Sequence, residues 1–355
     1  MQNHDQESLS LLRDSARDFC DAISLKTADA PSERWWSDIA GLGWLAVAAP
    51  EDAGGAGLGL TGAAVIANEL GKAGYTRGYA ETVALAHALR RGRDAGLVPA
   101  QEALQQVLQD SGSGALQLSL INPLGPHMPG EGLVADVGAP RLGLITYSES
   151  TGLCLHQIGE ATRQHLLKTT SRARDLLVCL DGEGFGADCV RIELAQGDAA
   201  LRVWQDAVMQ HRVLAASQLV GAVQTALAIS VDYARIRSQF GHLIGSYQAV
   251  QHAVVDMLAG SDAAELLVNR ALQAIDAASG DRASLADAAT AYAREVAWTS
   301  LMKTYDVLGG VGFIEVHPIN RYTRAVLLTL ASLGSASECE DATASHVRPG
   351  HWLAA

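Results

Sequence analysis

The sequence of 355 residues lacks several features that would assign it to a specialised class of protein. Its five cysteines include no C-x-x-C pair, so we expect reduced thiols and predict neither a disulfide framework nor a metal site. Positive charge is scarce, and the formal net charge of −13 argues against nucleic acid or an anionic membrane as a partner. The polar opening, Met-Gln-Asn-His-Asp-Gln-Glu, has no hydrophobic export signal, so we expect a cytoplasmic protein.

Residues 213–231 form an uncharged, mostly apolar run of 19 residues, which approaches the length of a membrane-spanning helix. Several polar side chains interrupt this run, and the flanking residues are His211, Arg212 and Asp232. A buried helix of a soluble bundle is therefore the better interpretation, and no membrane partner is predicted.

The spacing of apolar residues divides the chain into three parts. Residues 1–112 are rich in Ala and Leu at helical spacing, which predicts an N-terminal helical domain. Residues 113–205 hold short apolar runs between Gly, Pro, Asp and Asn, which predicts a small β domain. Apolar positions three and four apart return in residues 206–355 and predict a C-terminal four-helix bundle. The predicted strands are residues 116–121, 142–147, 153–155, 176–180, 190–194 and 201–204.

Residues 232–251 carry the pattern with the clearest chemical meaning. A helix ends on Arg235 and Arg237, the chain turns through Gly241 and Gly245, and a second helix follows. Fixed positive charge beside loose backbone N–H groups suits a phosphorylated ligand. The alternative is a solvated helix end, where the helix dipole favours arginines in any case.

A glycine-rich stretch at residues 306–318 is the second candidate. Gly309, Gly310 and Gly312 follow a predicted helix and would let the backbone approach a ligand closely. Taken alone, such a cluster is more often a helix stop.

Taken together, three stretches resemble signatures of the acyl-CoA dehydrogenase family. Residues 233–252 resemble its pattern of Tyr-Ala, Arg, Phe-Gly, Ile-Gly and Gln-Ala-Val-Gln-His. Gly-Gly-Val-Gly-Phe followed by His-Pro and Ile-Asn-Arg-Tyr resembles a second signature. Leu-Gly-Trp-Leu, the glycine-rich segment at 50–59 and Asn-Glu-Leu-Gly resemble a third. The resemblance covers the first 112 and the last 150 residues, and implies a mainly α fold with a middle β-barrel-like domain.

The resemblance also implies a cofactor, FAD, and residues that bind it. Arg237, Gln239, Phe240 and Ile244 match positions that hold the FAD of a neighbouring subunit. A planar guanidinium, always charged, is suited to pyrophosphate.

The glycine loop and one further arginine match other parts of the family's site. Gly309, Gly310 and Gly312 match the loop at the adenosine end of the cofactor. In the family this loop and the arginine motif belong to different subunits, so a cofactor site implies an oligomer. Arg212 matches a position near the CoA thioester; the alternative is an ordinary arginine at a helix start.

The family's catalytic carboxylate is missing from its usual position. In the family, a carboxylate removes the proton α to the thioester while flavin N5 accepts a hydride from the β carbon. Nine residues after Arg324, where that carboxylate is expected, the chain has Leu333. The position used by some members, just before Arg212, holds His211, which could accept a proton but could equally be a structural histidine at a helix start.

Three other features concern the missing base and the contacts to the cofactor. Glu338 and Glu340 lie a few residues beyond the expected base, where a loop shift could bring one of them in; the alternative is a solvated acidic turn. Asp306 replaces the usual Gln ahead of the glycines, and its charge would repel a phosphate. The β domain is short and lacks the stretches that normally touch the isoalloxazine ring.

The resemblance therefore implies one subunit of an FAD-dependent acyl-CoA dehydrogenase that desaturates an acyl-CoA thioester. It is similar to the short subunits that lack the glutamate and act on sterol side chains or other bulky acids. A homologous partner in an α2β2 assembly would supply the base, and an electron-transfer flavoprotein would take the electrons. Two alternatives remain: a self-sufficient homo-oligomer with an unusual base, and a non-catalytic, flavin-free stabilising subunit.

Overall fold

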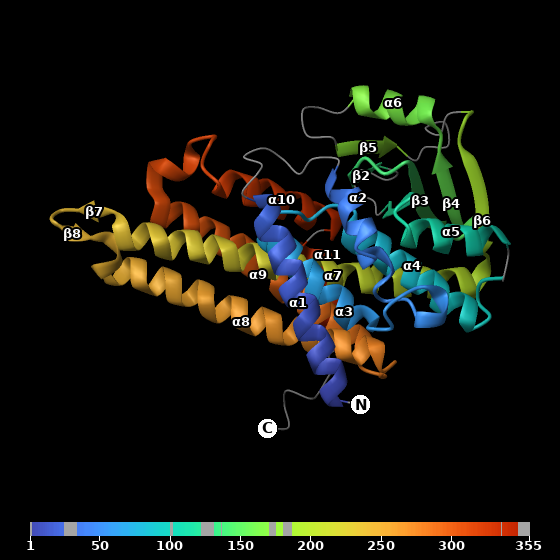
Figure 1. Ribbon diagram of the computed structural model, residues 1–355, viewed down its shortest axis with the longest axis horizontal. Coiled ribbons are helices and arrows are strands. Elements are labelled where there is room, and N and C mark those ends of the chain that lie inside the picture. Colours follow the sequence, from blue (N-terminus) through green and yellow to red (C-terminus); the bar gives the residue numbers. More distant parts are fainter. Residues whose placement is uncertain are drawn as a thin grey trace.

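Helices form most of the molecule in the computed structural model, and strands gather at one end of its long axis (Figure 1). The structure describes residues 2–24, 34–99, 102–121, 131–135, 137–169, 175–179, 187–334 and 336–346. The fold is that of a mainly α protein with a small sheet, as the sequence predicted.

The N-terminal part is helical because its Ala- and Leu-rich segments bury one face against the long C-terminal helices. Its helices are α1 (Gln2–Ser24), α2 (Arg34–Gly41), α3 (Gly59–Lys72), α4 (Tyr79–Asp94) and α5 (Glu102–Gly112). Two short 3₁₀ turns, η1 (Trp44–Ala46) and η2 (Glu51–Ala53), lie between α2 and α3. Helix α3 crosses α7 (Gly197–Ile236) so closely that a Cβ on Gly71 would meet the Gln218 carbonyl oxygen at 2.1 Å.

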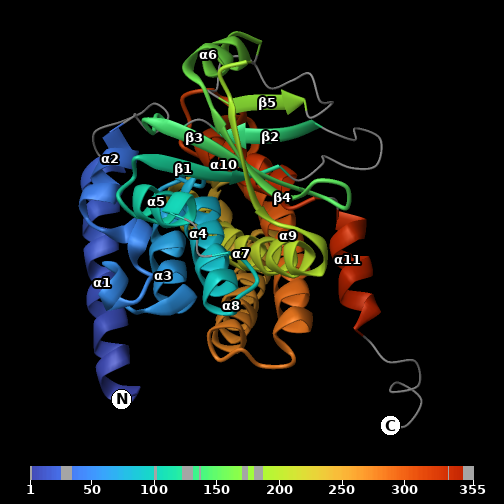
Figure 2. The ribbon, with the colours of Figure 1, turned by 90° about the vertical axis from the view of Figure 1, so that its right-hand side faces the viewer.

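The strands form a four-stranded sheet and a separate two-stranded pair, above the helices in Figure 2. The larger sheet has the order β1 (Leu116–Leu120), β3 (Arg141–Ser148), β4 (Gly152–Ile158), β6 (Val190–Ala195). Strands β1 and β3 are parallel, whereas the other neighbours are antiparallel. Strands β2 (Glu131–Ala135) and β5 (Asp175–Cys179) pair antiparallel, and α6 (Glu160–Thr169) lies between β4 and β5 in the chain.

Strand β1 is fixed to helix α4 by a reciprocal contact. Thr82 Oγ1 donates to the Leu118 carbonyl at 3.1 Å and accepts from the Leu118 N–H at 3.1 Å. Because Thr82 is fully buried, this contact sets how β1 lies on α4. It brings Glu81, which precedes Thr82 on α4, and Ser119, which follows Leu118 on β1, within hydrogen-bond distance of each other.

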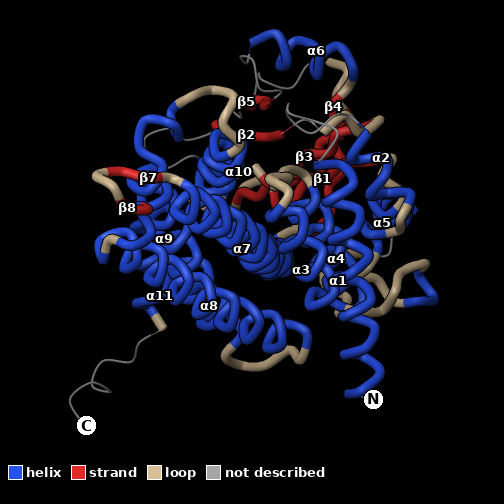
Figure 3. Tube along the Cα trace, turned by 60° about the vertical axis from the view of Figure 1, so that its left-hand side comes forward, coloured by secondary structure: helices blue, strands red, loops and turns tan. Residues whose placement is uncertain are grey.

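Long helices connected by short turns make up the C-terminal part (Figure 3). They are α7, α8 (Gln248–Asp276), α9 (Arg282–Leu308), α10 (Ile319–Ser332) and α11 (Ala336–Ser345). Between α7 and α8 lie β7 (Ser238–Gln239), β8 (His242–Leu243) and η3 (Ile244–Ser246), and η4 (Gly309–Phe313) follows α9. Within α7, 72% of the most apolar window is buried, which confirms that the uncharged run is a core helix.

Two expectations about the chain after β1 need correction. Residues 201–204 were predicted as a strand but belong to α7, where Ala200, Val203 and Ala207 form a buried face at helical spacing. The alternating Leu-Arg-Val-Trp pattern is therefore part of a helical stripe.

Strand β2 and helix α6 were not predicted from the sequence. Leu180, the last residue of the strand predicted at 176–180, lies outside the described residues. The helical texture returns at Gly197, whereas the sequence-based domain boundary was drawn at 205/206.

Candidate functional site

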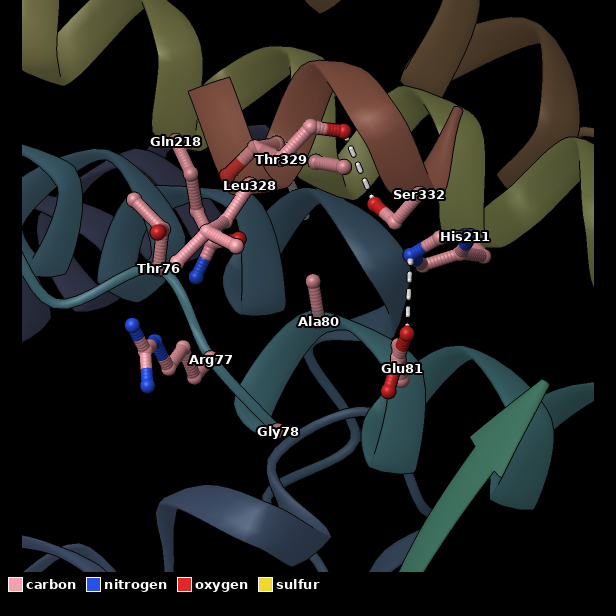
Figure 4. A pocket seen from close by; sticks show the side chains of 11 residues that line it. Thr76, Arg77, Gly78, Ala80, Glu81, His211, Gln218, Leu328, Thr329 and Ser332 are labelled. Atoms are coloured by element: carbon pink, nitrogen blue, oxygen red, sulfur yellow. Dashed lines mark hydrogen bonds and ion pairs between the residues drawn. The ribbon is translucent and has the colours of Figure 1, made fainter. Parts of the chain in front are cut away.

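A cleft lies between the start of α4, the middle of α7 and the end of α10 (Figure 4). About 450 Å³ of empty space, open solvent included, lies between its lining residues. Its polar lining comes from all three helices and from the loop before α4. The residues on which the argument depends are Arg77, Glu81, His211, Gln218, Thr329 and Ser332. We refer to this region as the cleft.

Glu81 and His211 face each other at one side of the cleft (Figure 4). Glu81 Oε1 lies 3.9 Å from His211 Nε2, too far for a hydrogen bond, while Ser119 Oγ donates to Glu81 Oε2 at 2.7 Å. The Glu81 side chain is 12% exposed and that of His211 is 5% exposed. Two ionisable groups are thus held side by side with little access to water.

Burial shifts the pKa values of these two groups in opposite directions. It raises the pKa of the Glu81 carboxyl to about 7, against the opposing effect of the Ser119 hydrogen bond. Burial, and then the charge of Arg212, lowers the pKa of His211 to about 4. At neutral pH the pair is therefore a neutral imidazole beside a carboxyl group that is close to its titration midpoint.

Gln218 is the second unusual residue of the cleft. Its side chain is fully buried, and neither its Nε2 nor its Oε1 has a hydrogen-bond partner among the described residues. Leaving a buried polar group unpaired costs about 1–3 kcal/mol. The amide therefore suits a ligand that offers both an acceptor and a donor.

Of the catalytic candidates from the sequence, only His211 lines the cleft. It lies inside α7, 14 residues after the helix begins at Gly197, so the expectation of a histidine at a helix start was wrong. Leu333 is fully buried next to the end of α10. Glu338 is exposed on α11 and does not line the cleft.

Arg212, the candidate for contact with the CoA thioester, is engaged elsewhere in this chain. Its Nη1 lies 3.6 Å from Oδ1 of Asp287 on α9, and His346 Nε2 approaches the other oxygen of Asp287 at 3.1 Å. The buried Nε of Arg212 has no partner within the described structure. Since Arg212 lies well inside α7, it is not a helix-start arginine either.

The arginine motif lies at the far end of α7, on the hairpin of β7 and β8. Phe240 and Gly241 form its two-residue turn with φ of 53° and 81°, the positive values of a tight hairpin turn. This turn leaves the Phe240 side chain 90% exposed. Arg237 and Gln239 are exposed as well, and the Arg237 guanidinium has no ion pair or hydrogen bond among the residues described.

Hydrogen bonds hold the base of this hairpin in place. The Ile244 N–H donates to the Arg237 carbonyl at 2.8 Å, and Tyr247 Oη donates to the Gln239 carbonyl at 3.0 Å. The hairpin is therefore a built projection, not a frayed helix end. Ile244 is half-buried at its base.

The glycine loop η4, between α9 and α10, lies at the same end of the molecule as the hairpin (Figure 1). Gly309 has a φ of 58°, and a Cβ on Gly309 or Gly310 would meet nothing within 4 Å. Both positions are therefore open to close approach by a ligand. Gly312 is different, because its Cβ would meet Tyr305 Cδ1 at 3.0 Å, which gives this glycine a packing role inside the chain.

The cleft and the hairpin that carries Arg237 lie too far apart in one chain to contact the same bound molecule. His211 lies in the middle of α7, whereas Arg237 immediately follows its last residue, Ile236. At about 1.5 Å per residue, the helix separates them by about 38 Å. We call the hairpin and η4 together the tip. A site that uses cleft and tip together needs two chains.

Comparison with known sequences decides the family. Residues 6–93 match "Acyl-CoA dehydrogenase, N-terminal domain", and residues 201–344 match "Acyl-CoA dehydrogenase, C-terminal domain". Together these matches cover well over half of the chain. The chain belongs to the acyl-CoA dehydrogenase family. Members of this family are FAD-dependent oxidoreductases and generally bind FAD.

Two sequence relatives indicate how far the similarity extends. Cyclohex-1-ene-1-carbonyl-CoA dehydrogenase of Syntrophus aciditrophicus (strain SB) is 31% identical over 125 residues, 35% of this chain and 30% of that enzyme. The match thus spans about a third of that relative. Acyl-CoA dehydrogenase IpdE2 of Mycobacterium tuberculosis is 26% identical over 283 residues, 79% of this chain and 76% of that protein.

Solved structures share the fold over nearly the whole chain. A variant of the Tcur3481-Tcur3483 steroid ACAD has a TM-score of 0.74 at 24% identity, covering 96% of this chain and 98% of that one. The ChsE4-ChsE5 complex from Mycobacterium tuberculosis has a TM-score of 0.76 at 20% identity, again with 96% and 98% coverage. At these identities the likeness concerns the fold alone.

The tip fits the phosphate end of a flavin dinucleotide in its chemistry. An exposed guanidinium without an internal partner, Arg237, is available for pyrophosphate. Gly309 and Gly310 leave their backbone accessible. Asp306 is exposed just before them and places a negative charge at this loop. Residues 122–130, directly after β1, lie outside the described part of the chain.

Sequence reasoning missed Glu81. The signal was a single carboxylate among apolar neighbours, Tyr79-Ala80-Glu81-Thr82-Val83, near the start of an Ala-rich helix. A charged residue inside an apolar helical face is rarely fully buried without a partner. Only the packing of β1 and α7 against α4 distinguishes Glu81 from the solvated glutamates of the sequence.

Proposed function

We propose that this chain is one subunit of an FAD-dependent acyl-CoA dehydrogenase that desaturates an acyl-CoA thioester in an α2β2 assembly with a homologous subunit. The separation of about 38 Å between cleft and tip carries this proposal, because each complete site then combines the cleft of one chain with the tip of another. The family supports the reaction type, and the separation supports the participation of a second chain.

In this proposal the tip reaches into the neighbouring subunit. Arg237 and Gln239 donate hydrogen bonds to the FAD held there, with Phe240 and Ile244 as apolar contacts. Because the family draws its glycine loop and its arginine motif from different subunits, Gly309 and Gly310 would accept the adenosine end of a second FAD, whereas Gly312 shapes the loop. When bound, the flavin supplies an acceptor for the hydride from the β carbon. Arg212 keeps its contact of 3.6 Å with Asp287 on α9 in this proposal.

Exposed apolar side chains on the surrounding helices support a partner chain. They are Val255, Leu258 and Leu266 on α8, Trp298 and Met302 on α9, and Phe313, Ile314 and Val316 in and after η4. Large exposed apolar side chains gathered on neighbouring elements are typical of interaction surfaces. The partner chain is also where a carboxylate at the usual family position can lie, since this chain has Leu333 there.

We propose a bulky or cyclic acyl group as the substrate class. One sequence relative carries a cyclohexene carbonyl-CoA substrate in its name, and one structural neighbour is named a steroid ACAD. The proposed electron acceptor is an electron-transfer flavoprotein, because a reduced flavin enclosed between subunits needs an external oxidant.

Co-expression tests the proposed function. The chain is purified alone and with a homologous subunit encoded beside it, and both samples are assayed for flavin absorbance and for desaturation of saturated acyl-CoA thioesters. The proposal expects a colourless, inactive chain and a yellow, active complex. A chain that is yellow and active alone would contradict the hetero-oligomer, and a colourless, inactive complex would favour a flavin-free stabilising subunit.

One observation favours a second candidate function, a self-sufficient homo-oligomer with an unusual base. Glu81 and His211 lie together in the cleft of this chain, so such a homo-oligomer would have a proton acceptor of its own. The same purification distinguishes it, because a homo-oligomer is yellow and active without any partner.

A further inference from the structure

The carboxyl group of Glu81 is held with one oxygen engaged and the other available. Ser119 Oγ donates to Oε2 at 2.7 Å, and Gln117 Nε2 donates in turn to Ser119 Oγ at 3.2 Å. Gln117 Oε1 accepts from the Val137 N–H at 3.3 Å, so the chain of hydrogen bonds ends on the backbone. Glu81 Oε1 points toward His211 and lies beyond hydrogen-bond distance from it. The side chain is thus oriented through Oε2, which leaves Oε1 for a proton.

An independent feature of the same cleft points to a ligand. Gln218 is fully buried, lines the cleft, and has no hydrogen-bond partner at either amide atom among the described residues (Figure 4). An acyl-CoA offers carbonyl oxygens for Nε2 and pantetheine N–H groups for Oε1. Ligand and proton acceptor would therefore share one cleft.

We propose that Glu81 is the base that removes the α-proton of an acyl-CoA bound in the cleft of this chain. The inference rests on the proposed function. It places a catalytic base in this chain, whereas the sequence analysis expected the base in the partner. The Cα–H bond breaks, its proton passes to Glu81 Oε1, and its electron pair becomes the new Cα=Cβ bond. A flavin bound beside the cleft would supply the acceptor for the hydride from the β carbon, which keeps the two-electron balance.

The surroundings of Glu81 favour it over the other candidates. Its pKa of about 7 matches that of an effective base at neutral pH, whereas His211, with a pKa of about 4, is a weak one. The charged and titratable groups that face this corner are His211 and Arg212 from α7 and Arg77 from the loop before α4. Glu338 lies on exposed α11, away from the cleft.

Isotope exchange tests the proposal. The complex of this chain with its co-expressed homologous partner, in which Gln replaces the partner's own carboxylate at the usual family position, is incubated in D2O with octanoyl-CoA or cyclohexanecarbonyl-CoA. The α-deuterium content is measured by mass spectrometry. Desaturation, acyl-CoA affinity and flavin content are measured on the same samples. In Glu81→Gln, we expect exchange and desaturation to fall about a hundredfold or more, because a general base contributes about 10²–10⁴ in rate. Affinity and flavin content should stay within about threefold, since Gln keeps the shape and can still accept from Ser119.

Two further variants keep the test decisive. Glu81→Asp retains a carboxylate and should restore part of both rates, which a purely structural role for Glu81 does not predict. Glu102→Gln, on exposed α5 outside the cleft, should match the wild type in every readout.

The outcomes separate this inference from the proposed function. An active complex whose Glu81→Gln variant keeps both rates within about threefold overturns the inference alone. The same holds if His211→Gln abolishes exchange while Glu81→Gln does not. A wild-type complex that holds no flavin and processes neither thioester overturns the proposed function, and the inference falls with it.

Discussion

The cleft lies beside the middle of α7 and the hairpin of the tip follows the end of that helix, yet the two regions differ in almost every physical respect. In the cleft, Gln218 is fully buried and Glu81 is 12% exposed, and their chemistry depends on the absence of water. At the tip, Phe240 is 90% exposed and Arg237 has no internal partner among the described residues. Under the proposed function, the cleft would enclose a ligand and the tip would reach into the partner chain. One chain would then carry halves of two different sites.

The largest expected effect tests whether the cleft is as buried as the geometry indicates. Between about pH 4.5 and 7 the folded chain keeps a proton on Glu81 that the unfolded chain has lost, so stability falls as pH rises. Between about pH 4 and 6.5 the unfolded chain holds a proton on His211 that the folded chain lacks, so stability rises. The two contributions oppose each other in the wild type.

Single variants separate these two contributions. Glu81→Gln should gain up to roughly 3 kcal/mol of unfolding free energy relative to the wild type as pH rises from 4.5 to 6.5. His211→Gln should lose a similar amount over the same range. Urea denaturation at several pH values measures both, and parallel pH profiles for all three proteins would show that the pair is solvated.

The next effect tests the tip. Arg237→Ala should weaken FAD binding in the assembled complex by roughly 10- to 100-fold, because a charge-assisted hydrogen bond is worth about 1.5–3 kcal/mol. Arg270→Ala, exposed on α8 near its pair Asp281, is the control and should not change FAD affinity. The FAD dissociation constant is measured by flavin fluorescence. Equal affinity in both variants would remove Arg237 from the site.

Gln218→Leu sharpens the comparison from the cleft side. An apolar side chain of similar size removes two unpaired buried polar atoms, so the free chain should become more stable by about 1–3 kcal/mol. Acyl-CoA affinity of the complex should fall at the same time. Exposed Gln109→Leu on α5 should change neither quantity appreciably. Lower stability in Gln218→Leu would mean that the amide has a partner inside the protein.

The smallest effect concerns the backbone of the tip. Phe240 and Ala278 are the non-glycine residues with positive φ in the described chain, at 53° and 51°. Glycine at either position should stabilise the isolated chain by about 1 kcal/mol, because a left-handed conformation costs other residues about 1–2 kcal/mol. Only Phe240→Gly should weaken assembly with the partner, as measured by sedimentation. Equal assembly in both variants would exclude the Phe240 ring from the interface.

The tip was predictable from the sequence and the cleft was not, for a physical reason. Hairpin and loop are encoded locally: Gly241 and Gly309 have positive φ, and the turns fall where the glycines lie. The cleft arises from three segments distant in sequence, and Glu81 gains its properties only from Ser119 and His211. The strand predicted at 201–204 was wrong for a related reason, since only a buried face that begins at Ala200 identifies the helix.

A crystal structure of the assembled complex with FAD tests the central claim most directly. The quantity to measure is the distance between the Arg237 guanidinium of this chain and the flavin pyrophosphate held in the cleft of the neighbouring subunit. The account predicts a direct contact of about 3 Å across the interface. An Arg237 that faces solvent, or a flavin bound entirely within one chain, would contradict it.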